Sequence, residues 1–282
     1  MLLTEKYLNL CNNRIYVRIA TSQNVKPRLA MVLIHGIGDH SGRYLDWMEK
    51  FEDLGVVWVT ADLPGHGLSS GKRGHFETIQ SPFCIVENLI TLAKNRFAGV
   101  PIVLYGNSMG GNICVNYVIQ NSPKIDGLIL TSPWIGLINR PPNWKIQLAK
   151  FVSPFLKKMT LKTGVKREQL TFNEKALDNF KKDNLVHGKI TLGTFLMMWD
   201  AAFYIRKNAS SIKIPTLLLH GVSDNITNWR TTMKLGLKFR QKSKFKSFEG
   251  MLHELHHDTN NNLVVKEITK WLNDTFLLQY EF

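Results

Sequence analysis

The segment 101–120 constrains the fold of this chain more than any other. It opens with Pro101-Ile102-Val103-Leu104-Tyr105, an apolar run typical of a strand buried on both faces, and residues 112–120 have a helical period. The residues between them are Gly106-Asn107-Ser108-Met109-Gly110-Gly111. A strand that enters a helix through so short a connection needs a very tight turn, in which glycines leave room for the close approach. The segment therefore predicts a strand–turn–helix unit with Ser108 at its apex.

Short apolar runs alternate with helical segments through most of the chain, which predicts a mostly parallel sheet with helices on both faces. This rhythm stops between about residues 132 and 211, where we find no convincing strand and many lysines. We therefore expect a core formed by residues 1–133 and 212–282, with an inserted helical cap at 134–211. The strands are predicted at 13–20, 29–34, 56–61, 101–105, 127–131, 215–220 and 245–248, and the helices at 43–54, 81–95, 112–120, 228–239 and 262–277.

Composition limits the partners of the protein. The 282 residues are 44% hydrophobic, which is enough for one large α/β domain with an insertion. The net charge of +14 comes mainly from lysines spread along the chain, and we interpret it as a solvated basic surface. Neither zinc-finger spacing nor a ribonucleoprotein motif occurs, so a nucleic-acid partner is not expected.

Cysteine usage and the N-terminus bear on location. The three cysteines Cys11, Cys84 and Cys114 are odd in number and include no Cys-x-x-Cys pair. We therefore expect neither a disulfide framework nor a structural zinc site, which fits a reducing, cytoplasmic location. The N-terminus has no apolar core of a signal peptide, and no apolar run approaches the roughly 18 residues that span a bilayer.

The turn at Ser108 also predicts a chemical role. In a strand–turn–helix context, Gly-x-Ser-x-Gly presents the serine hydroxyl at the carboxyl edge of the sheet, where the N-terminus of the helix favours developing negative charge. A glycine-rich turn with an incidental serine is the structural alternative. An acyl-transfer site also needs two donors for the oxyanion. The amide of Met109 is one candidate, and the amide of Ile37, in the loop after strand 29–34, is the other.

The acid and the base are expected after later strands, in the order serine, acid, histidine. Asp224 is the first carboxylate past strand 215–220, although an aspartate there also fits a turn or a helix cap. His253 is the first histidine past strand 245–248, and His256 is the competing assignment for the base. Ser108, Asp224 and His253 are thus the predicted catalytic residues.

Five sequence blocks, taken together, resemble the monoacylglycerol lipases and their lysophospholipase-like relatives, which have the α/β-hydrolase fold. The family patterns are H-G-x-G-[ED]-H-S-x-R-Y, D-x-x-G-H-G-x-S, G-x-S-M-G-G, G-x-x-D and G-x-x-H-E. The corresponding segments here are residues 35–44, 62–69, 106–111, 221–224 and 250–254. The resemblance implies that the insertion is a cap that admits lipid, that His253 is the base and that Ile37 and Met109 supply the oxyanion hole.

The expected substrate contacts come from the loop after the second strand and from the cap. His35 is interpreted chiefly as a residue that shapes this loop, and His40 as one that either contacts substrate or packs within the loop. Apolar residues at the entry of the cap and on its long helix are candidates for an acyl-chain tunnel, with ordinary packing as the alternative. The substrate-binding candidates are His35, Gly36, His40, Trp134, Leu137, Met198 and Phe203.

These predictions converge on a serine hydrolase that cleaves the ester of a single-chain lipid, with monoacylglycerol as the expected substrate. The reaction needs no metal and no cofactor. Lysophospholipase and broad-specificity carboxylesterase are alternatives, and a non-catalytic lipid-binding module is a more distant one. The lysines of the cap, interleaved with Phe151 and Phe155, suggest the hypothesis of a peripheral contact with an anionic membrane. Oligomeric state is not indicated.

Overall fold

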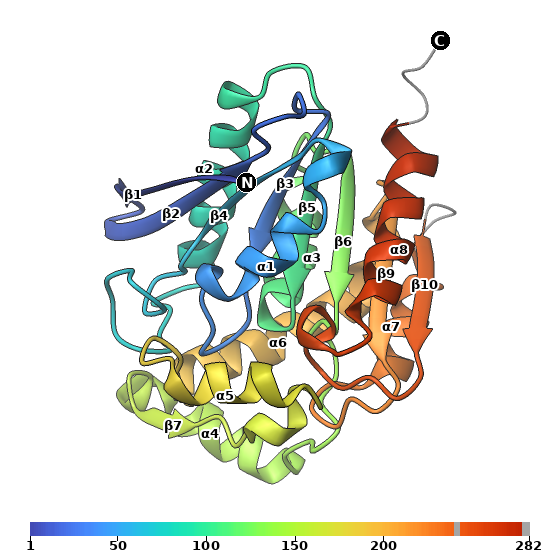
Figure 1. Cartoon of the computed structure of the whole chain (residues 1–282). Coiled ribbons are helices and arrows are strands. Elements are labelled where there is room, and N and C mark those ends of the chain that lie inside the picture. The colour runs from blue at the N-terminus through green and yellow to red at the C-terminus, as the bar shows by residue number, and fades with distance from the viewer. Residues whose placement is uncertain (240–242, 278–282) are drawn as a thin grey trace.

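A central eight-stranded sheet organises the molecule (Figure 1). The computed structural model describes residues 1–239 and 243–277. The strands lie in the order β1-β2-β4-β3-β5-β6-β9-β10, and all neighbours from β4 to β10 are parallel. The prediction of a mostly parallel α/β-hydrolase sheet is therefore confirmed. The strand bounds are β1 Leu2–Leu10, β2 Asn13–Thr21, β3 Leu29–Ile34, β4 Val56–Ala61, β5 Ile102–Asn107, β6 Gly127–Thr131, β9 Thr216–Gly221 and β10 Ser243–Phe248.

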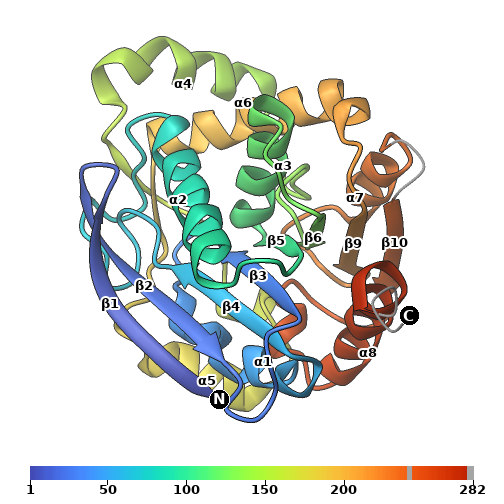
Figure 2. The same ribbon diagram turned by 90° about the horizontal axis from the view of Figure 1, so that it is seen from above.

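Helices cover both faces of the sheet (Figure 2). α2 and α3 lie on one face, whereas α1 and α8 lie on the other. The bounds are α1 Leu45–Glu49, α2 Gln80–Arg96, α3 Met109–Asn121, α4 Asn143–Leu156, α5 Glu174–Lys182, α6 Leu192–Asn208, α7 Trp229–Gly236 and α8 Asn261–Leu272, with a π-helical turn at Asn273–Leu277. No helix among these described residues is long and apolar enough to cross a membrane.

Strand β3 shows why the central strands read as continuous apolar runs. All six of its residues are buried, and successive side chains point to opposite faces. Ala30, Val32 and Ile34 join the core under α2 and α3, while Leu29 and Met31 join the core under α1 and α8. A strand with hydrophobic cores on both sides has no solvent face, so polar alternation is absent.

The segment between β6 and β9 packs across the carboxyl ends of the strands, at the bottom of Figure 1. It contains α4, α5 and α6 together with a two-stranded sheet of β7 Thr160–Lys162 and β8 Lys189–Thr191. The expectation that this region holds no strand is therefore wrong, because three-residue strands are too short to produce a period in the sequence. The division into core and cap at residues 134 and 211 stays a prediction.

Two further elements differ from the sequence prediction. β1 was not predicted, because it is an edge strand whose side chains are mostly exposed and therefore lacks an apolar face. The predicted helix at 43–54 is divided into a 3₁₀ turn at Ser41–Tyr44, α1, and a second 3₁₀ turn at Glu52–Leu54. Gly55 ends this segment in the left-handed conformation, as expected for a helix terminator.

A disulfide joins Cys11 to Cys84, so the expectation of no disulfide is wrong. Cys11 lies in the turn between β1 and β2, and Cys84 faces it from α2. The odd cysteine count misled because the third cysteine, Cys114, is a buried core residue. The cysteines therefore give no support to a reducing compartment.

The disulfide provides a test of stability. Because it links positions 73 residues apart, the Cys11→Ser/Cys84→Ser variant should lose about 2–4 kcal/mol of unfolding free energy, measured by urea denaturation. A reductant should destabilise the wild type and leave the double variant unchanged. Three free thiols in the unfolded, unreduced wild type would contradict the assignment.

Candidate active site

Ser108 occupies the sharp turn between β5 and α3. Its backbone has φ 53° and ψ −117°, a strained conformation for a residue with a side chain. The turn is fixed from both sides, because the Ser108 amide donates to the Thr131 carbonyl at 3.0 Å and the Ser108 carbonyl accepts from the Trp134 amide at 2.9 Å. At Gly110 a Cβ would lie 2.0 Å from the Ile34 carbonyl oxygen, so only glycine permits this approach of α3 to β3.

A continuous chain of hydrogen bonds runs from Ser108 through His253 to Asp224. The Ser108 hydroxyl lies 2.9 Å from Nε2 of His253, and Nδ1 of the same ring lies 2.7 Å from Oδ2 of Asp224. A proton on Nδ1 donates to the carboxylate, which leaves Nε2 as an acceptor for the hydroxyl proton. Asp224 follows β9 and His253 follows β10, so the carboxyl ends of adjacent parallel strands bring them together.

The carboxylate of Asp224 is buried and held by several donors. Oδ1 accepts from the amides of Ile226 and Thr227, at 2.8 and 3.0 Å, and Oδ2 accepts from the Thr227 hydroxyl at 2.7 Å. His220, which ends β9, places Nε2 3.0 Å from the same Oδ2 and Nδ1 3.0 Å from the Thr232 hydroxyl. These contacts fix the carboxylate opposite His253.

Electrostatics favour the charges that base catalysis requires. Burial would raise the pKa of Asp224, but His253 and the hydrogen bond from His220 hold that pKa well below its usual range. Burial would lower the pKa of His253, but the charge of Asp224 and the hydrogen bond to it raise the pKa above the ordinary value. The pair therefore stabilises an imidazolium that forms during reaction.

Two backbone amides near Ser108 are free to bind an oxyanion. Among the described residues, neither the Ile37 amide nor the Met109 amide donates a hydrogen bond. A Cβ on Gly36 would lie 3.3 Å from the Ser108 Cβ, which shows how closely the loop carrying Ile37 approaches the serine. The oxyanion-hole assignment of Ile37 and Met109 stays a prediction.

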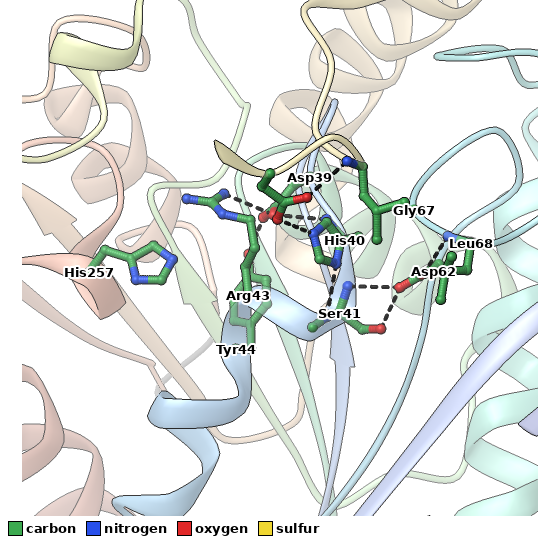
Figure 3. Close-up of polar contacts among 12 residues, drawn as sticks. Asp39, His40, Ser41, Arg43, Tyr44, Asp62, Gly67, Leu68 and His257 are labelled. Carbon is green, nitrogen blue, oxygen red and sulfur yellow. Dashed lines mark hydrogen bonds and ion pairs between the residues drawn. The ribbon is translucent and has the colours of Figure 1, made fainter. Parts of the chain in front are cut away.

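Buried polar contacts shape the loop that carries Ile37. Nε2 of His35 accepts from the Leu63 amide at 2.9 Å, which agrees with its interpretation as a loop-shaping residue. Oδ1 of Asp62 accepts from the Ser41 amide at 2.9 Å, and Oδ2 accepts from the Leu68 amide at 2.8 Å (Figure 3). The two loops that follow β3 and β4 are thereby tied together.

The segment that leads into α1 also contacts the loop that carries His253. The Arg43 guanidinium contacts both carboxylate oxygens of Glu254, at 2.8 and 2.7 Å, and lies 2.9 Å from Oδ1 of Asp39. Oδ2 of Asp39 accepts from the Tyr44 hydroxyl at 2.8 Å (Figure 3). Because Glu254 directly follows His253, this buried ion-pair cluster fixes one side of His253.

His256, the competing assignment for the base, does not contact Ser108. Its ring is buried and stacked on Tyr44 with a centroid distance of 4.4 Å. The pKa of His256 lies well below the ordinary value, chiefly because the ring is buried and secondly because His257 is its neighbour. His256, His257 and Glu254 are also close enough to resemble metal ligands, but Arg43 already binds both oxygens of Glu254 and would repel a cation.

A cavity of about 580 Å³ opens above Ser108 and His253. Gly36, Trp134 and Leu137, three of the substrate-binding candidates, line it. Sequence reasoning missed several apolar wall residues because all of them except Phe180, which lies on α5, are on irregular segments and short strands of the insertion, which give no periodic signal. These are Leu161, Val165, Leu170, Phe180, Val186 and Ile190.

The structure places the other four substrate-binding candidates outside the cavity wall. His35 lies beneath the loop. His40 bonds to Asp183 of the insertion at 2.7 Å, so it packs between loops. Met198 is fully buried in the core beside α3, and Phe203 lines a separate, smaller cavity. Whether these four residues contact substrate stays a prediction. For Met198 and Phe203, position on an apolar helix does not reveal which face meets the cavity.

The Arg43 cluster should give a distinctive pH dependence of stability. Burial would raise the pKa values of Asp39 and Glu254, but Arg43 lowers both to about 2, below ordinary values of 3.8 and 4.5. These depressed values contribute stability above about pH 4.5 that is lost as pH falls toward 2. In Arg43→Met the guanidinium is gone, so burial raises the pKa values of both carboxyls. The variant should therefore be about 3–5 kcal/mol less stable than the wild type at pH 7. This difference in stability should narrow toward pH 4, because the buried carboxyls of the variant take up protons as pH falls.

Urea denaturation of both proteins between pH 7 and pH 4 measures this gap. Arg96→Met, which removes an exposed arginine, is the control and should behave as the wild type at every pH. A gap that stays constant with pH would show that Arg43 acts by packing alone.

Comparison with known proteins places this site in a family. Residues 25–260 match the model of a hydrolase family described as serine aminopeptidase, S33. The monoglyceride lipase homolog of monkeypox virus is 28% identical, over 95% of this chain and 98% of that protein. Phospholipase YtpA of Bacillus subtilis is 27% identical, over 86% of this chain and 93% of that protein.

A solved structure gives the same result. The monoacylglycerol lipase of Paleococcus ferrophilus superposes with a TM-score of 0.82 and 29% identity, covering 92% of this chain and 99% of that one. The resemblance to monoacylglycerol lipases is thereby confirmed. The family model matches well over half of this chain, which therefore belongs to the serine aminopeptidase S33 family of α/β-hydrolases.

Proposed function

We propose that this protein hydrolyses the carboxylic ester of a monoacylglycerol to a fatty acid and glycerol, with Ser108, His253 and Asp224 as its catalytic residues. The observation that carries the proposal is the hydrogen-bonded chain of these three side chains, of which Ser108 and His253 line the cavity. The similarity to a monoacylglycerol lipase and to a monoglyceride lipase homolog supports the choice of substrate.

The geometry gives each group a step. The Ser108 oxygen attacks the ester carbonyl carbon while Nε2 of His253 takes the hydroxyl proton, and Asp224 stabilises the imidazolium. The amides of Ile37 and Met109 bind the oxyanion. His253 then returns the proton to the glycerol oxygen, which leaves. A water molecule, deprotonated by His253, attacks the acyl-enzyme, and the fatty acid departs as Ser108 regains its proton.

The walls of the cavity suit an acyl chain. Leu161, Leu170, Ile190 and Phe195 supply apolar surface from the insertion, and the volume lies in the range of small-molecule sites. Asn139 and Thr163 add polar atoms to the same wall. A single acyl chain with a small polar head matches this distribution. The similarity to phospholipase YtpA supports lysophospholipid as the second candidate, because it too carries one acyl chain.

The substrate assignment predicts a ranking of activities. Long-chain monoacylglycerol should give a higher kcat/KM than lysophosphatidylcholine or a short-chain nitrophenyl ester, measured with the wild type. Ser108→Ala should abolish all three activities while its circular dichroism and melting temperature stay unchanged. Preference for lysophosphatidylcholine would make the protein a lysophospholipase, preference for the short ester would make it a general esterase, and residual turnover by Ser108→Ala would reject the mechanism.

We also propose that α4 docks on an anionic membrane surface. Ile146 and Val152 pack toward α6, yet a second apolar stripe faces outward. This stripe has the helical spacing i, i+4, i+7, i+11, and its members are exposed by 64, 54, 80 and 90%. It consists of Trp144, Leu148, Phe151 and Phe155. Lys145 of the same helix, which lies over the Trp144 ring, complements anionic headgroups, whereas Lys150 pairs with Asp200.

Removing the two most exposed rings tests this contact. Phe151→Ser/Phe155→Ser should sediment several-fold less with vesicles that contain phosphatidylserine, because it loses apolar surface that would enter the interface. Added salt should weaken binding of the wild type. The control is Leu237→Ser, which removes a leucine 81% exposed near the end of α7. Binding that depends on neither the rings, nor salt, nor anionic lipid would reject the proposal.

A further inference from the structure

A second cavity, of about 300 Å³, lies beside the catalytic one and shares two wall residues with it, Trp134 and Leu137. The segment that follows β6, the last turns of α6 and the first turn of α7 enclose it. In Figure 2, α6 runs across the molecule toward the side where α7 lies. The proposed reaction leaves this cavity without a role.

Two arginines line the second cavity without a counter-charge. The guanidinium carbons of Arg140 and Arg206 lie 5.6 and 4.3 Å from the centre of the same ring, that of Phe203. No described carboxylate forms an ion pair with either arginine. The pKa of Arg206 is lowered, chiefly by burial and secondly by the positive charge of Arg140. Two like charges are thus held together, an arrangement that an anion would relieve.

Apart from Thr231 of α7, the rest of the wall is apolar and aromatic. Arg140 also lies 5.3 Å from the centre of the Trp199 ring, and Ala202 completes the surface contributed by α6. One N–H of Arg206 is used, because it donates to the Ile135 carbonyl at 2.5 Å. The remaining N–H groups of the two guanidinium ions are donors of the kind that a carboxylate accepts, while the rings suit methylene groups.

We propose that this second cavity binds a free fatty acid, with its carboxylate between Arg140 and Arg206 and the first part of its chain against Trp199 and Phe203. An anionic amphiphile satisfies both halves of the wall, which neither a neutral lipid nor a small inorganic anion does. The choice of a fatty acid among such amphiphiles rests on the proposed function, because that reaction releases one on the other side of Trp134 and Leu137.

Calorimetric titration of the wild type with laurate tests the site without any turnover. We expect two classes of binding site, one in each cavity. Arg140→Gln/Arg206→Gln should weaken one class at least tenfold and leave the other unchanged. Dodecanol, which has the tail without the charge, and inorganic phosphate, which has the charge without the tail, should show no binding that depends on these arginines.

Matched variants keep the test decisive. Arg230→Gln removes an exposed arginine on α7 that stacks on Trp229, and it should bind laurate as the wild type does. Arg140→Gln alone is the safeguard against misfolding, because Arg140 is exposed and its replacement should not disturb the fold. This single variant should lose part of the affinity for laurate. Laurate binding that survives the double substitution would overturn the proposal, and so would phosphate binding equal to that of laurate. Neither result depends on whether Ser108 is catalytic.

Discussion

The strained turn at Ser108 is the constraint on which the rest of the site depends. A side chain held at φ 53° between a buried strand and a helix is stable only where its surroundings fix it. Hydrogen bonds to Thr131 and from Trp134 do so here, and Gly110 lets α3 pass against the carbonyl of Ile34. The hydroxyl consequently projects past the carboxyl edge of the sheet, where the loops after β9 and β10 can reach it.

A second requirement is to bury charge next to an apolar cavity. The buried carboxylate of Asp224 accepts hydrogen bonds from two backbone amides and one hydroxyl. The charges of Asp39, Arg43 and Glu254 are buried together and pair with one another. The cluster also contacts the insertion, since Phe180 of α5 lies under the Arg43 guanidinium at 4.9 Å. The cavity, the loop that carries Ile37 and the loop that carries His253 are therefore parts of one packed unit, so a change in the insertion is expected to alter the surroundings of Ser108.

The sequence predicted the sheet and the convergence of Ser108, His253 and Asp224 well, because both rest on local rules. Buried strands such as 29–34 and 56–61 lack polar residues, and the site residues directly follow strand ends, which parallel pairing brings to one edge. The prediction failed where structure depends on distant contacts. The pairing of Cys11 with Cys84 joins elements far apart in sequence, and Met198 and Phe203 share a helix yet face a core and a different cavity. Periodicity reveals that a helix is apolar without revealing what each face meets.

The proposed nucleophile, Ser108, can be identified directly by mapping the site of a covalent probe. The wild type would be treated with a fluorophosphonate, digested and analysed by mass spectrometry, with and without excess monoacylglycerol. We expect a single phosphonylated residue, Ser108, and slower labelling when monoacylglycerol is present. Labelling of another residue, or no labelling of a folded protein, would contradict this proposal.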